Sequence, residues 1–170
     1  DDAERDARPP VSVRWEVFAD EGLRRRVAQG AHDTDATRAF SVHVPVAGLA
    51  PGRHYWYRFT CGDAKSATGR TRTAPAADAV VGRLRLALGA CQHYEQGFYA
   101  AHRETAQRDL DAVLFVGDYI YEGHVGAARA VRRHGAGEPQ TLDDYRARHA
   151  LYKRDADLQA AHAAHPWILT

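Results

Sequence analysis

The chain has 170 residues, of which 45% are hydrophobic and 26% are charged, with a formal net charge of +1. This near-neutral balance gives no electrostatic case for specific binding of nucleic acid or of an anionic membrane. No apolar run approaches the roughly 20 residues that a transmembrane helix needs. Length and composition therefore indicate a globular protein of one or two domains.

The first half of the chain alternates apolar and polar residues at the period of β-strands. We expect strands at residues 11–18, 25–31, 40–46, 55–59 and 69–73, after a charged, frayed end over residues 1–10. The sequence Leu49-Ala50-Pro51-Gly52 predicts a turn, because proline fixes φ and glycine accepts positive φ. Short strands joined by turns predict a small β-sandwich, and five strands are fewer than the seven of a complete one.

Residues 74–82 are rich in alanine, proline and glycine and predict a boundary near residue 80. We therefore expect one domain over residues 1–79 and a second over residues 80–170. Beyond the boundary, the apolar runs 84–90 and 112–116 are typical of buried parallel strands. The helical pattern of residues 97–110 between them predicts a β-α-β unit with a right-handed crossover.

Three reactive side chains follow the two strands of this unit: Cys91 after the first, and Asp118 and Tyr121 after the second. Ligands of open α/β sheets bind beyond the carboxyl ends of strands, so these side chains are expected at one edge. Each has a simpler interpretation by itself. Cys91 could be a small buried apolar residue, Asp118 a turn residue and Tyr121 a packing aromatic. Their combination favours a metal site.

Residues 123–140 predict a long loop that carries the basic set Arg129, Arg132, Arg133 and His134. Such a loop is either a solvated face or a site for substrate phosphate, since arginine forks match phosphate geometry. Thr141 and Asp155 are the expected first residues of two following helices, and Pro166 ends the second. A further strand is expected from Trp167.

The segments GACQ (residues 89–92) and VGDYIYE (residues 116–122) resemble those of the alkaline phosphatase D family of metallophosphoesterases. The second segment also fits the wider pattern of purple acid phosphatases, but those usually have a carboxylate at the position of Cys91. The resemblance implies an α+β chain of two domains. The first would be an incomplete immunoglobulin- or fibronectin III-like β-sandwich, and the second the first β-α-β part of an α/β metallophosphoesterase sheet.

The resemblance also implies a function and a set of ligands. Cys91 and Tyr121 would hold Fe(III), and Asp118 would be shared with Ca(II). A hydroxide bound to metal would then attack a phosphate mono- or diester. Members of the family are secreted, periplasmic or on the cell surface, although this chain shows no signal peptide.

The chain departs from the family in its remaining ligands. The family adds an asparagine and later aspartate and histidine ligands, whereas this chain contains no asparagine. We therefore expect residues 1–170 alone to be inactive as a phosphatase. Two alternatives stay open: a hydrolase of the purple acid phosphatase type, and a non-catalytic fibronectin-like binding module with a degenerate phosphatase remnant. A disulfide between Cys61 and Cys91 is disfavoured, because it would consume Cys91. The oligomeric state is not predicted.

Overall fold

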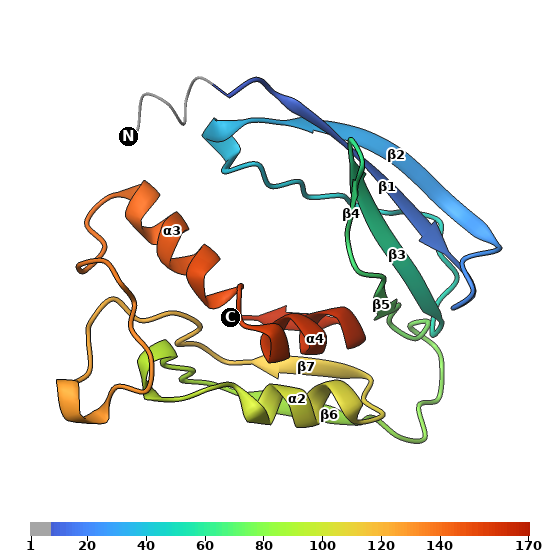
Figure 1. The fold of residues 1–170 in the computed structure, drawn as a ribbon. Coiled ribbons are helices and arrows are strands. Elements are labelled where there is room, and N and C mark those ends of the chain that lie inside the picture. Colours follow the sequence, from blue (N-terminus) through green and yellow to red (C-terminus); the bar gives the residue numbers. More distant parts are fainter. Residues whose placement is uncertain (1–7) are drawn as a thin grey trace. The chain divides into compact units, whose positions relative to one another are not determined.

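The computed structural model describes residues 8–170, and the chain divides into two compact units, residues 1–81 and 82–170. Figure 1 shows the strands of the first unit in blue and green and the elements of the second from green to red. Residues 1–7, which belong to the expected frayed end, lie outside the described part of the chain.

The first unit is built on one antiparallel sheet of five strands. Its strands are β1 (Val11–Phe18), β2 (Arg26–Thr34), β3 (His54–Cys61), β4 (Ala64–Lys65) and β5 (Gly69–Arg72). They run in the order β2-β1-β3-β4, and β5 also pairs with β3. A short 3-10 helix, η1 (Ala36–Arg38), follows β2. The predictions of strands near residues 11–18, 25–31, 55–59 and 69–73 are confirmed.

The strand predicted at residues 40–46 is wrong, because this segment is irregular. Phe40 has a φ of 55°, outside the extended region, and Pro45 has no N–H to offer to a neighbouring strand. The apolar side chains of this segment are nevertheless half-buried. Val44, Val46 and Leu49 line a common hollow with residues of the inner sheet face, namely Trp15, Val17, Tyr57 and Phe59. Residues 8–81 thus form one sheet covered by a loop, where the sequence predicted an incomplete sandwich.

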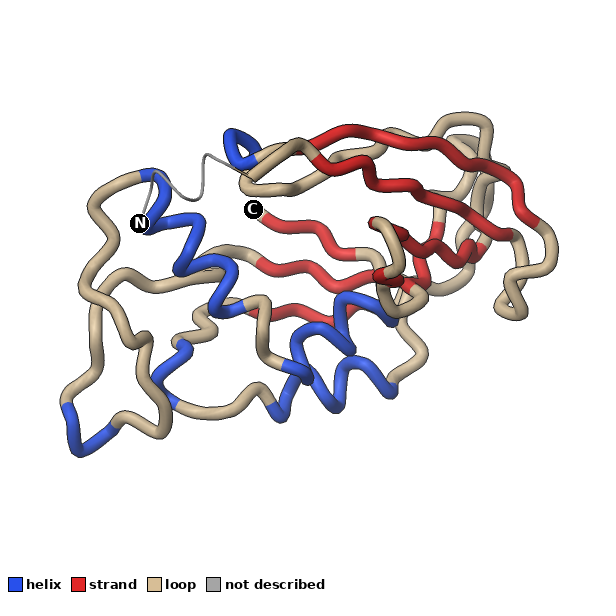
Figure 2. The backbone as a smooth tube through the Cα atoms, turned by 45° about the horizontal axis from the view of Figure 1, so that its top comes forward, coloured by secondary structure: helices blue, strands red, loops and turns tan. Residues whose placement is uncertain are grey.

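The second unit contains a parallel sheet of three strands in the order β6-β7-β8, which Figure 2 shows in red. The strands are β6 (Leu86–Gly89), β7 (Ala112–Phe115) and β8 (Trp167–Leu169). The helix α2 (Ala100–Gln107) connects β6 to β7, which confirms the predicted β-α-β unit. None of the helices in the described residues combines the length and apolar character needed to cross a bilayer.

Two further helices, α3 (Leu142–Tyr152) and α4 (Ala156–Ala164), follow β7 and precede β8 along the chain. Thr141 and Asp144 form a reciprocal capping box at the start of α3. The carboxylate of Asp155 accepts from two backbone N–H groups in the first turn of α4. Both predicted helix starts are therefore confirmed. The 3-10 turns η2 (Tyr94–Gln96) and η3 (Ala127–Arg129) complete the unit.

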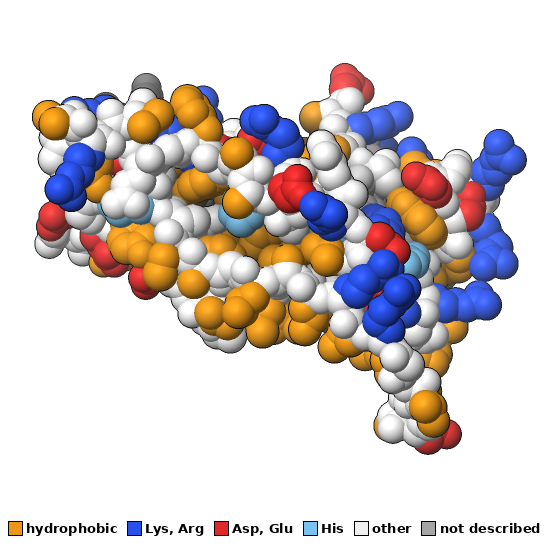
Figure 3. All heavy atoms as spheres, turned by 90° about the horizontal axis from the view of Figure 1, so that it is seen from below, with side chains coloured by type: hydrophobic (Ala, Val, Ile, Leu, Met, Phe, Trp, Pro, Cys, Tyr) orange, Lys and Arg blue, Asp and Glu red, His pale blue; other side chains and the backbone are white. Residues whose placement is uncertain are grey.

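The core of the second unit is rich in aromatic residues. Tyr99, Tyr152 and Leu158 are buried together, and Tyr94, Tyr119, Ile120 and Trp167 pack against them. Other apolar residues of the sheet stay at the surface, and Figure 3 shows hydrophobic side chains on the face that it displays. Leu86 and Leu88 of β6 and Ile168 and Leu169 of β8 are exposed. Part of the apolar sheet surface is therefore uncovered in the described chain.

Candidate active site

The three side chains predicted to form a site come together beyond the ends of β6 and β7. The Oδ2 atom of Asp118 accepts a hydrogen bond from Tyr121 Oη at 2.7 Å. The same oxygen accepts from Cys91 Sγ at 3.3 Å. One carboxylate oxygen of Asp118 thus accepts from a thiol 27 residues away along the chain and from a phenol 3 residues away.

The backbone around these residues is unusual. Cys91 has a φ of 58° and Asp118 a φ of 51°, a left-handed region that residues other than glycine rarely adopt. Backbone strain of this kind is concentrated at functional sites, where the surrounding structure holds it in place. Here the two loops hold each other, since the N–H of Cys91 donates to Gly117 O and that of Gln92 to Asp118 O, both at 3.2 Å.

The electrostatics of the site favour an ionised carboxylate. The hydrogen bonds from Tyr121 and from Cys91 lower the pKa of Asp118 below its usual range. The same bond to Asp118, followed by one with Cys91, raises the pKa of Tyr121. Cys91 and Asp118 are both exposed, so a ligand can approach them.

This arrangement fits a metal ion. The thiol and the phenol each direct a proton at one carboxylate oxygen, so a cation that replaces those protons would meet three converging donors. Thiolate, phenolate and carboxylate are all metal ligands in their deprotonated forms. Cys91, Asp118 and Tyr121 are therefore the residues that would hold an ion here.

Two side chains of helix α3 hold the main chain of Tyr121 by hydrogen bonds. The buried hydroxyl of Tyr152 accepts from the N–H of Tyr121 at 3.1 Å. The buried guanidinium of Arg148 donates to the carbonyl oxygens of Tyr121 at 2.6 Å and of Glu122 at 2.7 Å. Both polar groups of the Tyr121 backbone are thus satisfied by one helix.

A second polar cluster, not predicted from the sequence, consists of Glu95, His124 and His134. Possible ligand atoms of these three residues all lie within 4.8 Å of one another. The buried carboxylate of Glu95 accepts from the backbone N–H of Val125 at 2.8 Å and of His134 at 2.9 Å, and it lies 3.0 Å from His124 Nδ1. Burial by itself would raise the pKa of Glu95, but these donors outweigh it and lower the pKa to about 2.

The hydrogen bonds of Tyr152 indicate how His134 is protonated. The Tyr152 hydroxyl already accepts from the N–H groups of Tyr94 and Tyr121, so its own hydrogen is free for His134 Nε2, 3.1 Å away. The ring hydrogen of His134 then lies on Nδ1, which faces Glu95 at 3.7 Å and has no hydrogen-bond partner. Burial, and then the charge of Arg148, lower the pKa of His134 to about 4.

An ion in this cluster would need the lone pair of His134 Nδ1, so the ring hydrogen would have to leave Nδ1, and moving it to Nε2 would end the hydrogen bond that Nε2 accepts from Tyr152. Distance alone makes the cluster a candidate metal site, but its hydrogen bonding favours a structural role. In that role Glu95 ties the loop that contains His124 and His134 to η2. The ring of His93 lies 4.7 Å from that of Tyr121 and 5.4 Å from that of His134, so the cluster and the site are neighbours.

The basic residues predicted to bind substrate have different surroundings. The guanidinium of Arg132 lies 3.7 Å from the centre of the Tyr94 ring and pairs with Asp155 at 2.7 Å. Arg132 is thus engaged inside the unit, and Arg129 and Arg133 are the exposed arginines of this segment. Cys61 and Cys91 are both free cysteines in the structure.

Models of known protein families match both units of the chain. The model of the PhoD-like phosphatase family matches residues 86–170, and the model of the PhoD-like phosphatase N-terminal domain matches residues 2–75. The chain belongs to the PhoD-like phosphatase family. The segment that matches the phosphatase model lies within the second unit and includes Cys91, Asp118 and Tyr121.

Individual relatives show the same likeness. The chain is 45% identical over 164 residues to the alkaline phosphatase D of Bacillus subtilis (strain 168), an alignment that covers 94% of this chain and 28% of the relative. A solved structure of PhoD matches with a TM-score of 0.92 and 44% identity, over 96% of this chain and 33% of that one. The chain therefore spans about a third or less of the length of these PhoD proteins.

Proposed function

We propose that this PhoD-like chain contributes to a phosphatase that hydrolyses phosphate mono- or diesters at Cys91, Asp118 and Tyr121. The observation that carries the proposal is the convergence of a thiol, a carboxylate and a phenol on one oxygen atom, on a backbone held at positive φ. Membership of the family supports the reaction class.

The ligand chemistry supports Fe(III) and Ca(II) as the metals. Cys91 and Tyr121 would hold Fe(III), because thiolate and phenolate are strong anionic donors. An oxygen of Asp118 would be shared with Ca(II), which prefers oxygen ligands. Bound ions would supply Lewis-acid polarisation of the phosphate and an activated water as the nucleophile, so no side chain has to attack phosphorus.

The residues of the chain would then bind and orient. Asp118, ionised and exposed, would fix the position of the ions relative to the strand ends. Arg129 and Arg133 would attract the negative substrate, since guanidinium groups pair with phosphate oxygens in a bidentate way. Arg148 and Tyr152 would hold the backbone of Tyr121 so that its phenol stays aimed at Asp118.

Three ligands do not hold two ions at a fixed separation, because metal affinity depends on the number of ligands and on a preformed geometry. We therefore propose that residues 1–170 alone turn over a chromogenic phosphate ester far more slowly than the roughly 10 s⁻¹ that is typical of enzymes. The family likeness also supports a location outside the cytoplasm, whether secreted, periplasmic or on the cell surface.

The test is the change of Tyr121 to Phe in the full-length protein loaded with Fe(III). Ligation by a phenolate should give a visible charge-transfer band that this substitution abolishes or shifts strongly. Tyr145→Phe is the matched control, because Tyr145 is exposed and its hydroxyl bonds to Glu122. An iron-loaded, active protein whose spectrum is unchanged in the Tyr121→Phe variant would remove Tyr121 from the site.

A further inference from the structure

The outer face of the sheet in the first unit carries a concentration of positive charge that the near-neutral total conceals. Strand alternation places the even-numbered residues of β1 and β3 on the face opposite to Trp15 and Val17. Pairing with the neighbouring strands adds their residues to this face. Its cationic side chains are Arg14, Arg26, Arg58, Lys65, Arg70 and Arg72, against the carboxylates of Glu16 and Asp33.

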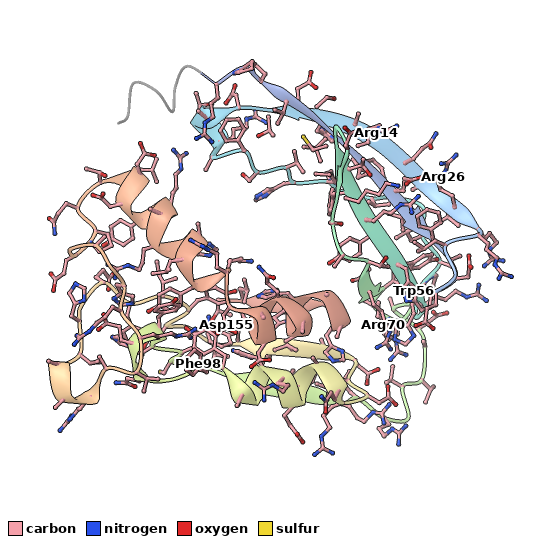
Figure 4. The ribbon with its side chains drawn as sticks, viewed as in Figure 1. Arg14, Arg26, Trp56, Arg70, Phe98 and Asp155 are labelled. Atoms are coloured by element: carbon pink, nitrogen blue, oxygen red, sulfur yellow. The ribbon has the colours of Figure 1, made fainter. Side chains whose placement is uncertain are left out.

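Four of these cations surround a hollow of about 510 Å³ on that face. Arg14 comes from β1, Arg26 from β2, Arg58 from β3 and Lys65 from β4, and Figure 4 labels the first two. The carboxylate that lines the hollow with them is that of Glu16. The hollow thus has a clear excess of positive charge, in a chain whose net charge is only +1.

Glu16 orders two of the cations. Its Oε1 accepts from Arg26 Nη1 at 2.7 Å, and its Oε2 accepts from Arg58 Nε at 2.8 Å. These bonds use one N–H group of each guanidinium, and a guanidinium carries five. The remaining donors are held in place before a ligand arrives, which reduces the entropy that binding must offset. The guanidinium of Arg58 is further fixed over the ring of Phe18, at 5.4 Å.

The other two cations, Arg14 and Lys65, are exposed and form no ion pair within the described residues. Together the four span the strands β2, β1, β3 and β4. Adjacent strands lie about 4.8 Å apart, so the row is wider than a single phosphate group. Three of the four are arginines, whose forks match phosphate oxygens better than single carboxylates along a flexible chain.

We propose that this hollow binds a polyanion that carries successive phosphate groups, and that it anchors such a polymer on the first unit. The role is separate from ester hydrolysis at Cys91, Asp118 and Tyr121. It does not depend on that activity, because it rests only on the charge and geometry of the β1–β4 face.

The experiment is to measure the binding of linear inorganic polyphosphate by calorimetry at several salt concentrations. The double variant Arg14→Gln/Lys65→Gln removes the two exposed cations, and thermal unfolding checks that it remains folded. The matched control, Arg38→Gln/Arg53→Gln, removes the same charge from exposed residues of the same unit that do not line the hollow.

Binding by the double variant should be at least about tenfold weaker, and the slope of log K against log [salt] should fall by about 2, one for each lost phosphate contact. The control should change affinity by about twofold or less, since screening at physiological salt limits charge effects to about 8 Å. Poly-glutamate of equal charge should bind more weakly than polyphosphate.

Three results would overturn the proposal: no binding of polyphosphate by the unmodified protein, equal losses in the two double variants, or equal affinity for poly-glutamate. Hydrolysis of a small chromogenic ester by the full-length protein is expected to be the same in both double variants. Failure of the anchor and failure of the phosphatase proposal are therefore distinguishable.

Discussion

Two polar clusters of the second unit each centre on a carboxylate, but they differ in exposure and in hydrogen bonding. Cys91, Asp118 and Tyr121 form an open cluster. Two of these residues are exposed and have positive φ, and the thiol and the phenol both donate to one oxygen of Asp118. Glu95, at the centre of the other, is fully buried and accepts short hydrogen bonds from two backbone N–H groups. Proximity of ligand atoms alone would favour the second cluster as the metal site. Exposure, strain and the accounting of hydrogen atoms favour the first.

The largest effect that separates the clusters is expected from Asp118→Asn in the full-length protein. Loss of one preorganised electrostatic contact typically lowers kcat by about 10²–10³, and a shared ligand should cost at least as much. Steady-state hydrolysis of a chromogenic ester, together with metal content, measures this. Asp143→Asn is the control, because Asp143 is an exposed partner of Arg146 on the surface of α3. Near-normal turnover and metal content in Asp118→Asn would contradict the assignment.

Glu95→Gln should act on stability. The amide keeps the size of the side chain but places a donor against backbone N–H groups, and leaving buried charge-assisted bonds unmade costs about 3 kcal/mol. Urea unfolding of the chain measures the change, with the exposed helix pair of Glu104 as the control, in Glu104→Gln. A rise of Tm on addition of Zn²⁺ that Glu95→Gln removes would show that the buried cluster binds metal after all.

A smaller effect is expected from Tyr152→Phe, which connects the two clusters. Without the hydroxyl, the N–H groups of Tyr94 and Tyr121 lose their acceptor, at a cost of about 1–3 kcal/mol in the free energy of unfolding. Tyr145→Phe, on the exposed side of α3, should lower the free energy of unfolding by only a few tenths of the loss in Tyr152→Phe. If Tyr152 positions Tyr121, the charge-transfer band of the iron-loaded full-length protein should also shift. A stability loss without a shift would make Tyr152 purely structural.

The last test changes only the pH and leaves the protein unmodified. His134 has a folded-state pKa of about 4 against an ordinary value of 6.5, so its unfolded form binds more protons between these values. Glu95, at about 2 against 4.5, acts likewise at lower pH. The free energy of unfolding should therefore fall as the pH falls between the unfolded and folded pKa values of each group, by at most about 1.4 kcal/mol per pH unit. Urea unfolding at pH 7, 5 and 4 measures this. Stability that rises on acidification would contradict the burial of neutral His134.

The open cluster could be predicted from the sequence because its position follows from strand ends. Cys91 and Asp118 each come just after an apolar run, and parallel strands bring their carboxyl ends to one edge. The caps at Thr141 and Asp155 were likewise predictable, because capping depends on residues within one turn. These predictions needed only local pattern and one rule of topology.

The buried cluster could not be predicted in this way. Glu95 meets His134 across 39 residues and a loop without periodicity, so no pattern in the sequence pairs them. Residues 40–46 failed for a related reason. The alternation there indicates that one side of the segment is partly buried. A strand also requires a partner for its backbone, and Phe40 and Pro45 do not provide one.

The two backbone hydrogen bonds that join Cys91 to Gly117 and Gln92 to Asp118 have a consequence for the order of assembly. They continue the pairing of β6 with β7 beyond the strands themselves, so the site forms when these two strands pair. The amides of Cys91 and Gln92 should then exchange with deuterated solvent at the rate of the sheet opening, and not at that of a surface loop. An incoming ion would find its ligands already in position, and the chelation step would be limited by diffusion and proton release.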